Sequence, residues 1–163
     1  MTSLPNALPS LLGDIPHAEA VFLALRAAGL LFMTGLLTGL WKYLAIAASP
    51  RSRAPYYVDV AHRSALLYAF AALLTAALAA CSPWSEALTW WAVAGPLAFF
   101  FAAVFTYLVH GWLDDTRNQL APPYRLARWS LPGWVIHGFM GVLAVVEIAG
   151  AAVLVAGLFV TPG

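Results

Sequence analysis

Four long apolar stretches dominate the sequence, and short polar segments that contain proline separate them. The stretches run over residues 20–48, 58–80, 87–113 and 134–160. A helix of about 20 apolar residues crosses the hydrocarbon core of a bilayer, and each stretch is long enough to do so. The prolines mark the breaks between helices. The pattern predicts an all-α, integral membrane four-helix bundle that forms one transmembrane domain over residues 1–163.

The composition agrees with this pattern. Of the 163 residues, 63% are hydrophobic and 9% are charged, and the mean hydropathy is +0.83, which leaves too little polar surface for a soluble domain. The net charge of +1, without a run of lysine or arginine, argues against a nucleic-acid partner. The single cysteine, Cys81, excludes an internal disulfide and a thiolate metal cluster. Met1–Pro16 does not resemble a signal peptide and is expected to lie on the membrane surface.

Basic residues indicate the orientation of the bundle. They cluster around the first and third connections between helices. The second connection has no basic residue, and its one charged residue is Glu86. The basic residues concerned are Lys42, Arg51, Arg53 and Arg63, then Arg117, Arg125 and Arg128. The positive-inside rule therefore predicts that connections one and three are cytoplasmic. Both termini then face outward (N-out/C-out), across the cell's inner (cytoplasmic) membrane.

Small residues at helical spacing predict where helices pack closely. Gly35 and Gly39 lie one turn apart on the first helix. The second helix carries alanines at a similar spacing: Ala65, Ala69, Ala72, Ala76 and Ala80. Such spacing lets two helix backbones approach each other within a membrane.

Three histidines are expected at one depth. His62 lies near the start of the second helix, His110 near the end of the third and His137 near the start of the fourth, each within a turn or two of the cytoplasmic end,. They either form part of a site or are solvated separately at the membrane interface. On the third helix, Tyr107, His110 and Asp114 share one stripe, so that Asp114 either orients the imidazole or ends the helix in water.

Glu147 is expected within the hydrocarbon region, about 20 Å along the fourth helix from Trp134. An ionisable side chain is costly at that depth, and it is therefore expected to be neutral or paired. It is a candidate for function, and the alternative is a protonated carboxyl that hydrogen-bonds to a neighbouring helix.

The chemistry suggested by these residues is haem binding. The chain has no CxxCH, HExxH or GxSxG motif and no glycine-rich phosphate loop, so covalent haem, zinc hydrolysis, serine hydrolysis and phosphoryl transfer lack support,. Histidines among aromatic and small residues in a membrane bundle suit b-type haem. Three of the four histidines share one depth, and His17 alone lies at the outer surface, ahead of the first helix. A two-haem carrier across the bilayer would need histidine pairs at two depths and is therefore not expected.

Three short motifs stand out: Gly39-Leu40-Trp41, the pair Ala61-His62, and Tyr107 followed by Arg117-Asn118. Together they resemble the motifs of the small four-helix membrane enzymes typified by styrene oxide isomerase. The resemblance implies a homotrimer that holds ferric haem b at the boundary between protomers, with His62 as the axial ligand to iron. It also implies a redox-neutral isomerase in which the iron acts as a Lewis acid on a lipophilic, epoxide-like substrate and Tyr107 helps to place that substrate.

The chain departs from the family pattern on the substrate side. Tyr68 and Ala103 stand where the family has asparagines, so that Tyr68 joins Tyr107 as a candidate catalytic residue. His110 and His137 are extra candidates, together with Trp41, for haem contact. Either histidine could contact haem propionates, donate protons or supply a second axial ligand.

Three functions therefore stay open at the level of the sequence. The first is the haem-dependent isomerase, the second a single-haem electron-transfer subunit, and the third a haem-free accessory or transport protein of the membrane. A five-coordinate or water-ligated ferric haem would favour the first, and a haem with two imidazole ligands would favour the second.

Overall fold

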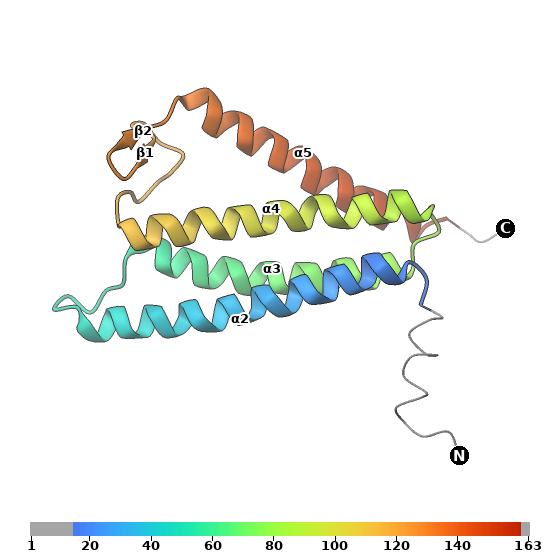
Figure 1. Ribbon diagram of the computed structural model, residues 1–163, viewed down its shortest axis with the longest axis horizontal. Coiled ribbons are helices and arrows are strands. Elements are labelled where there is room, and N and C mark those ends of the chain that lie inside the picture. Colours follow the sequence, from blue (N-terminus) through green and yellow to red (C-terminus); the bar gives the residue numbers. More distant parts are fainter. Residues whose placement is uncertain (1–14, 161–163) are drawn as a thin grey trace, which may run out of the picture.

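The computed structural model describes residues 15–160 and contains four long helices in that part of the chain (Figure 1). They are α2 (Ala18–Ala48), α3 (Tyr56–Ala80), α4 (Glu86–Leu113) and α5 (Gly133–Gly157). Each is long and apolar enough to span a membrane. The prediction of an all-α protein with four such helices is confirmed, whereas most of the segment Met1–Pro16 lies outside the described residues.

The helix ends agree with the predicted ranges to within two residues, with one exception. The last helix was expected to reach residue 160 but ends at Gly157. The N–H groups of Leu158 and Phe159 donate to carbonyls three residues back, at 3.0 and 3.1 Å. These tighter turns end the α-helical hydrogen-bond ladder.

A small hairpin in the third connection was not predicted. Strand β1 (Arg125–Leu126) pairs antiparallel with β2 (Trp129–Ser130). Between them Ala127 has a positive φ of 54°, which is uncommon for a residue with a Cβ. The hairpin folds the connection between α4 and α5 back onto the end of the bundle (Figure 1).

The helices α2 and α3 lie side by side, and small residues line their contact. The buried residues of α3 include Ala61, Ala65, Ala69, Ala72, Ala76 and Ala79. The last of these was expected to be Ala80, but a spacing of three residues keeps the stripe facing its partner better than a spacing of four. At Gly35 the approach is so close that a Cβ would lie 2.5 Å from the Leu66 side chain.

Helix α5 packs against α4 along its C-terminal half and diverges toward the hairpin (Figure 1). The two helices approach closely at Gly150, where a Cβ would lie 2.6 Å from the Ala92 carbonyl oxygen and from Pro96 Cγ. Because Pro96 has no N–H, it cannot donate to that carbonyl, which lies four residues before it. The glycine thus packs against the one turn of α4 where proline interrupts the ladder.

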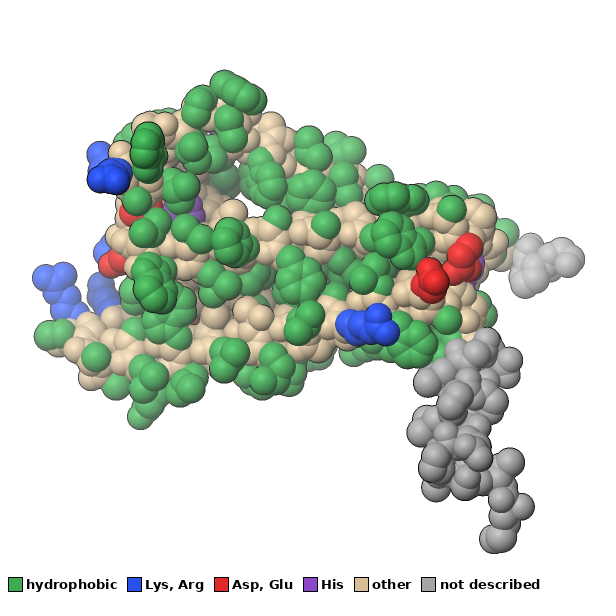
Figure 2. All heavy atoms as spheres, viewed as in Figure 1, with side chains coloured by type: hydrophobic (Ala, Val, Ile, Leu, Met, Phe, Trp, Pro, Cys, Tyr) green, Lys and Arg blue, Asp and Glu red, His purple; other side chains and the backbone are tan. Residues whose placement is uncertain are grey.

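The surface agrees with a bundle that sits in lipid. Hydrophobic side chains cover the length of the helices, while most lysine and arginine side chains gather at the hairpin end (Figure 2). The start of α2 and the end of α5 lie together at the opposite end of the molecule (Figure 1).

Candidate functional site

His62 lies on α3 and packs against α2. Its Nδ1 donates a hydrogen bond of 2.8 Å to the carbonyl oxygen of Gly35. The ring lies over Gly39, where a Cβ would come within 2.8 Å of His62 Cε1. On α2, Gly35 therefore provides the hydrogen-bond acceptor for the imidazole, and Gly39 provides the space for its ring. In the described part of the chain, no hydrogen bond engages Nε2.

A charged cluster lies near His62 at the same end of α3. The Asp59 carboxylate pairs with Lys42 of α2, and its other oxygen lies 2.7 Å from Arg63 Nη2. His62 is close enough to Asp59 for electrostatic interaction. Two basic groups therefore lie beside the histidine, both paired with Asp59, and the side chains of all three charged residues are partly exposed.

The candidate tyrosines lie at the contact between α3 and α4, on a different face of α3 from His62. Tyr107 of α4 stacks on Tyr57, with ring centroids 5.9 Å apart, and His110 also lies against Tyr57 at 5.2 Å. Tyr68 stacks on Phe100 at 4.4 Å. At 100° per residue, Tyr57 and Tyr68 differ by about 20° around α3, whereas His62 is about 120° from Tyr68. Within one chain, the structure groups the two candidate tyrosines and separates them from His62.

Glu147 of α5 lies near both candidate tyrosines. Tyr68 and Tyr107 are each close enough to it for electrostatic interaction. Its Oε1 is buried and has no hydrogen-bond partner among residues 15–160. Three helices thus contribute oxygen atoms to one region within the apolar span. The expectation that Glu147 hydrogen-bonds to a neighbouring helix finds no support at this atom.

Asp115, not Asp114, orients His110. Helix α4 ends at Leu113, and Asp114 adopts a left-handed conformation with φ 46° and donates its N–H to the His110 carbonyl. The stripe predicted through residue 114 therefore stops short. The chain turns back there, and Asp115 Oδ1 accepts a hydrogen bond of 2.8 Å from His110 Nδ1.

The second oxygen of Asp115 connects the histidine to the hairpin. Oδ2 accepts a hydrogen bond of 2.6 Å from the N–H of Ala127. Burial of the carboxyl opposes its ionisation, but the hydrogen bonds from His110 and Ala127 outweigh that effect and hold the pKa of Asp115 below its usual value,. A carboxylate at neutral pH thus fixes the imidazole.

His137 and Trp41 lie apart from these groups. His137 Nε2 and the Tyr124 hydroxyl share a hydrogen bond of 2.9 Å. Trp41 follows Gly39 by two residues and so lies on nearly the opposite side of α2 from His62. The three histidines share one end of the bundle, as predicted from their depth, but each faces a different contact. No three His, Cys, Asp or Glu side chains within residues 15–160 come together as a metal-ion site.

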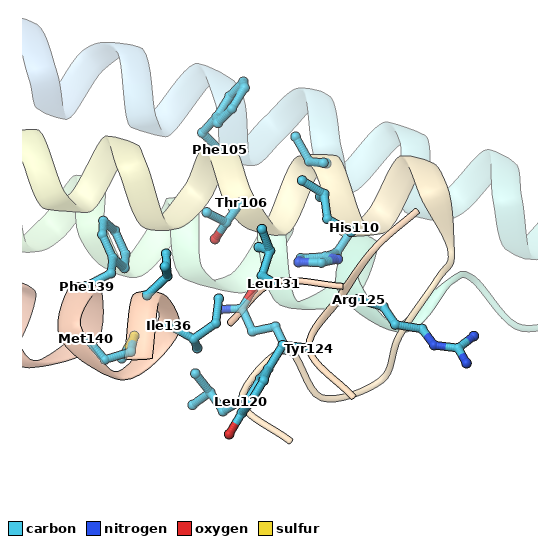
Figure 3. A pocket seen from close by; sticks show the side chains of 14 residues that line it. Phe105, Thr106, His110, Leu120, Tyr124, Arg125, Leu131, Ile136, Phe139 and Met140 are labelled. Carbon is cyan, nitrogen blue, oxygen red and sulfur yellow. The ribbon is translucent and has the colours of Figure 1, made fainter. Parts of the chain in front are cut away.

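A pocket of about 290 Å³ lies where α5 diverges from α4. Figure 3 shows Thr106 and His110 of α4 facing Ile136 and Met140 of α5 across it. The connecting segment covers one side with Leu120, Tyr124 and Leu131, whereas the Arg125 guanidinium points away.

Three residues of these sites were not found from the sequence. Tyr57 had a usable signal, because it precedes the buried alanines Ala61 and Ala65 at four-residue spacing. Predicting the contact of Asp115 with His110 would have required knowing the exact residue at which α4 ends. Tyr124 lies in an irregular segment where periodicity gives no information.

No family model, curated protein or solved structure matches the chain. The resemblance to styrene oxide isomerases therefore stays a prediction from the short motifs around Trp41, His62 and Tyr107.

Proposed function

We propose that this membrane protein binds haem b through His62 and catalyses the redox-neutral isomerisation of a lipophilic, epoxide-like substrate. The observation that carries the proposal is the hydrogen bond from His62 Nδ1 to the Gly35 carbonyl. Histidines that ligate metals nearly always donate their other ring nitrogen to a carboxylate, a carbonyl or water, which fixes the tautomer. His62 is arranged in this way.

The residues around His62 fit the proposed cofactor. With Nδ1 protonated, the neutral imidazole has its lone pair on Nε2, which is the form that binds haem iron. Gly39 provides the space that the His62 ring occupies against α2. Lys42 and Arg63 are the nearby basic groups that would pair with haem propionates. When bound through one imidazole, ferric haem supplies a Lewis acid with an open coordination position.

The role of the tyrosines follows from their position. The Tyr107 hydroxyl makes no hydrogen bond to any residue in the described range, so it is free to donate one to a substrate oxygen. Its ring is held by Tyr57, whose own hydroxyl accepts a hydrogen bond of 2.7 Å from the Gln119 N–H. In a dry site such a donor interacts more strongly than in water. Tyr68 would bound the same region from α3.

A homotrimer would bring the two parts of the site together. His62 of α3 faces α2, whereas Tyr107 of α4 stacks on Tyr57 at a different face of α3, so one chain does not provide both beside a single ligand. A haem held at the boundary between protomers, as the resemblance implies, would meet His62 of one copy and the tyrosine face of another.

We further propose the N-out/C-out orientation in the inner membrane, on the strength of the basic residues at the hairpin end. The native Cys81 offers a test, because it is exposed and directly follows α3 at the opposite end. A membrane-impermeant maleimide added outside intact spheroplasts should label it. A cysteine at Ser52 in a Cys81→Ser background should react only after lysis, and the reverse pattern would invert the topology.

The catalytic proposal predicts turnover without a redox partner. The purified protein should convert aryl epoxides to carbonyl isomers without added NAD(P)H, flavin or oxygen. Tyr107→Phe should lower the rate by about 100- to 1000-fold, because it removes one hydrogen-bond donor, while haem content stays constant. Since Tyr68 and Ala103 replace the family's asparagines, the assay requires epoxides of several shapes.

The matched control is Tyr43→Phe, which alters an exposed tyrosine on α2. If Tyr107→Phe and Tyr43→Phe slow the reaction equally, Tyr107 has no specific role in catalysis. A low-spin haem that turns over none of the epoxides but is rapidly reduced and reoxidised would contradict the isomerase and favour electron transfer.

A further inference from the structure

We infer that the pocket between α4, α5 and residues 114–132 is a second site, separate from His62, which binds a lipophilic molecule through a hydroxyl group that donates to His110 Nε2. The inference does not depend on haem. It rests on the size of the pocket, its lining and the fixed tautomer of one histidine.

The volume suits a ligand of two fused rings. An apolar cavity of about 150 Å³ binds benzene, and this pocket measures about 290 Å³. Its walls are mostly aliphatic and aromatic, with Ile136, Phe139 and Met140 on one side and Leu131 on another. An apolar lining with few converging polar groups is typical of small-molecule sites.

Most of the polar groups around the pocket are already engaged. The Thr106 hydroxyl donates to the Ala103 carbonyl at 2.8 Å, and the Tyr124 hydroxyl is hydrogen-bonded to His137. Arg125 points away (Figure 3). His110 and Gln119 are left to bind a polar group, and His110 is the buried one, at 8% exposure.

The tautomer of His110 determines what it recognises. The Asp115 carboxylate accepts the hydrogen bond, so His110 Nδ1 carries the proton. In the neutral ring, the other nitrogen, Nε2, is then unprotonated and acts as a hydrogen-bond acceptor. Both side chains are 9% exposed, and Ala127 holds the carboxylate in place. His110 Nε2 has no hydrogen-bond partner among residues 15–160, and it lies in the wall of an apolar pocket, where a hydrogen bond from a ligand adds to binding. A phenol or alcohol provides the donor, whereas an ether or a lipid acyl chain does not.

The test compares two probes of similar shape, 2-naphthol and 2-methoxynaphthalene, binding to the full-length protein in lipid nanodiscs. Partitioning into empty nanodiscs is subtracted from each. We expect wild-type protein to prefer 2-naphthol by about tenfold, as one buried hydrogen bond would give. His110→Phe should abolish the preference and retain binding of the ether, and Ile136→Trp should block both probes by filling the pocket.

Asp115→Asn provides a test that does not depend on the folding of the His110 variant. It removes the carboxylate that fixes Nδ1–H and should reduce the preference without emptying the pocket. His62→Ala should leave the preference unchanged, which separates this site from the haem proposal. Equal binding of the two probes by wild-type protein, or a preference that survives both His110→Phe and Asp115→Asn, would overturn the inference.

Discussion

Replacing His62 with alanine is expected to remove haem from the purified protein while the bundle still inserts. The substitution deletes the ring that packs against Gly35 and Gly39 at the contact between α2 and α3. Losing merely the outer hydrogen-bond partner of a ligating histidine costs about 10- to 100-fold in metal affinity. Loss of the ligand itself should exceed this range, and the ratio of haem to protein should fall by about tenfold or more.

The measurement is a pyridine haemochromogen assay alongside the Soret band, made on the detergent-solubilised protein. His137→Ala is the matched control, because it removes an exposed histidine at the same end of the bundle. It should keep its haem. If His62→Ala retains full haem and either His110→Ala or His137→Ala loses it, the assignment of the axial ligand is wrong.

A Gly39→Leu variant examines the same site without touching the ligand. Its side chain would have to occupy space taken by the His62 ring, since even a Cβ comes within 2.8 Å of Cε1. Haem content should fall while His62 is intact. Gly29→Leu, on the same helix, has no atom within 4 Å of its Cβ position and should behave as wild type.

Gly150→Leu is expected to have the largest effect on stability. Its Cβ would lie 2.6 Å from the Ala92 carbonyl oxygen, a backbone atom that cannot rotate away. Overpacking typically costs about 1–3 kcal/mol, and here the alternative is to separate α5 from α4 along their main contact. Thermal unfolding in detergent, followed by circular dichroism, should show a clearly lower midpoint.

Gly141→Leu serves as the control on the same helix. No atom lies within 4 Å of its Cβ position, and replacing glycine in a helix interior otherwise gains up to about 1 kcal/mol of helix propensity. Its midpoint should equal or exceed that of wild type. A Gly150→Leu protein as stable as Gly141→Leu would show that the close approach of α5 to α4 is not required.

The sequence was sufficient to predict the helices because their length and hydropathy are strong signals. Rise per residue also placed His62, His110 and His137 at one end of the bundle. It could not say which neighbour each histidine faces, since that depends on how helices pair around the bundle. His62 faces α2 through Gly35, whereas His110 faces the segment that follows its own helix.

The segment between α4 and α5 was the least predictable part. Strands of two residues leave no alternating pattern, and the positive φ of Ala127 has no sequence signal such as glycine or asparagine,. The interaction of Asp115 with His110 depends on this fold, because Ala127 holds the carboxylate. Asp115, and not the predicted Asp114, therefore contacts His110 because of the tertiary fold of this segment. Helical periodicity in the sequence carries no information about that fold.

The divergence of α5 from α4 has a consequence for how ligands arrive. Phe105 and Phe139, which line the pocket, are respectively 65% and 38% exposed on the apolar flank. A lipophilic ligand would enter sideways, from the acyl chains, after it has dissolved in the bilayer. Its effective concentration is then a mole fraction in lipid. Adding lipid at constant protein and total ligand should dilute the ligand and weaken apparent binding, even though the site itself is unchanged.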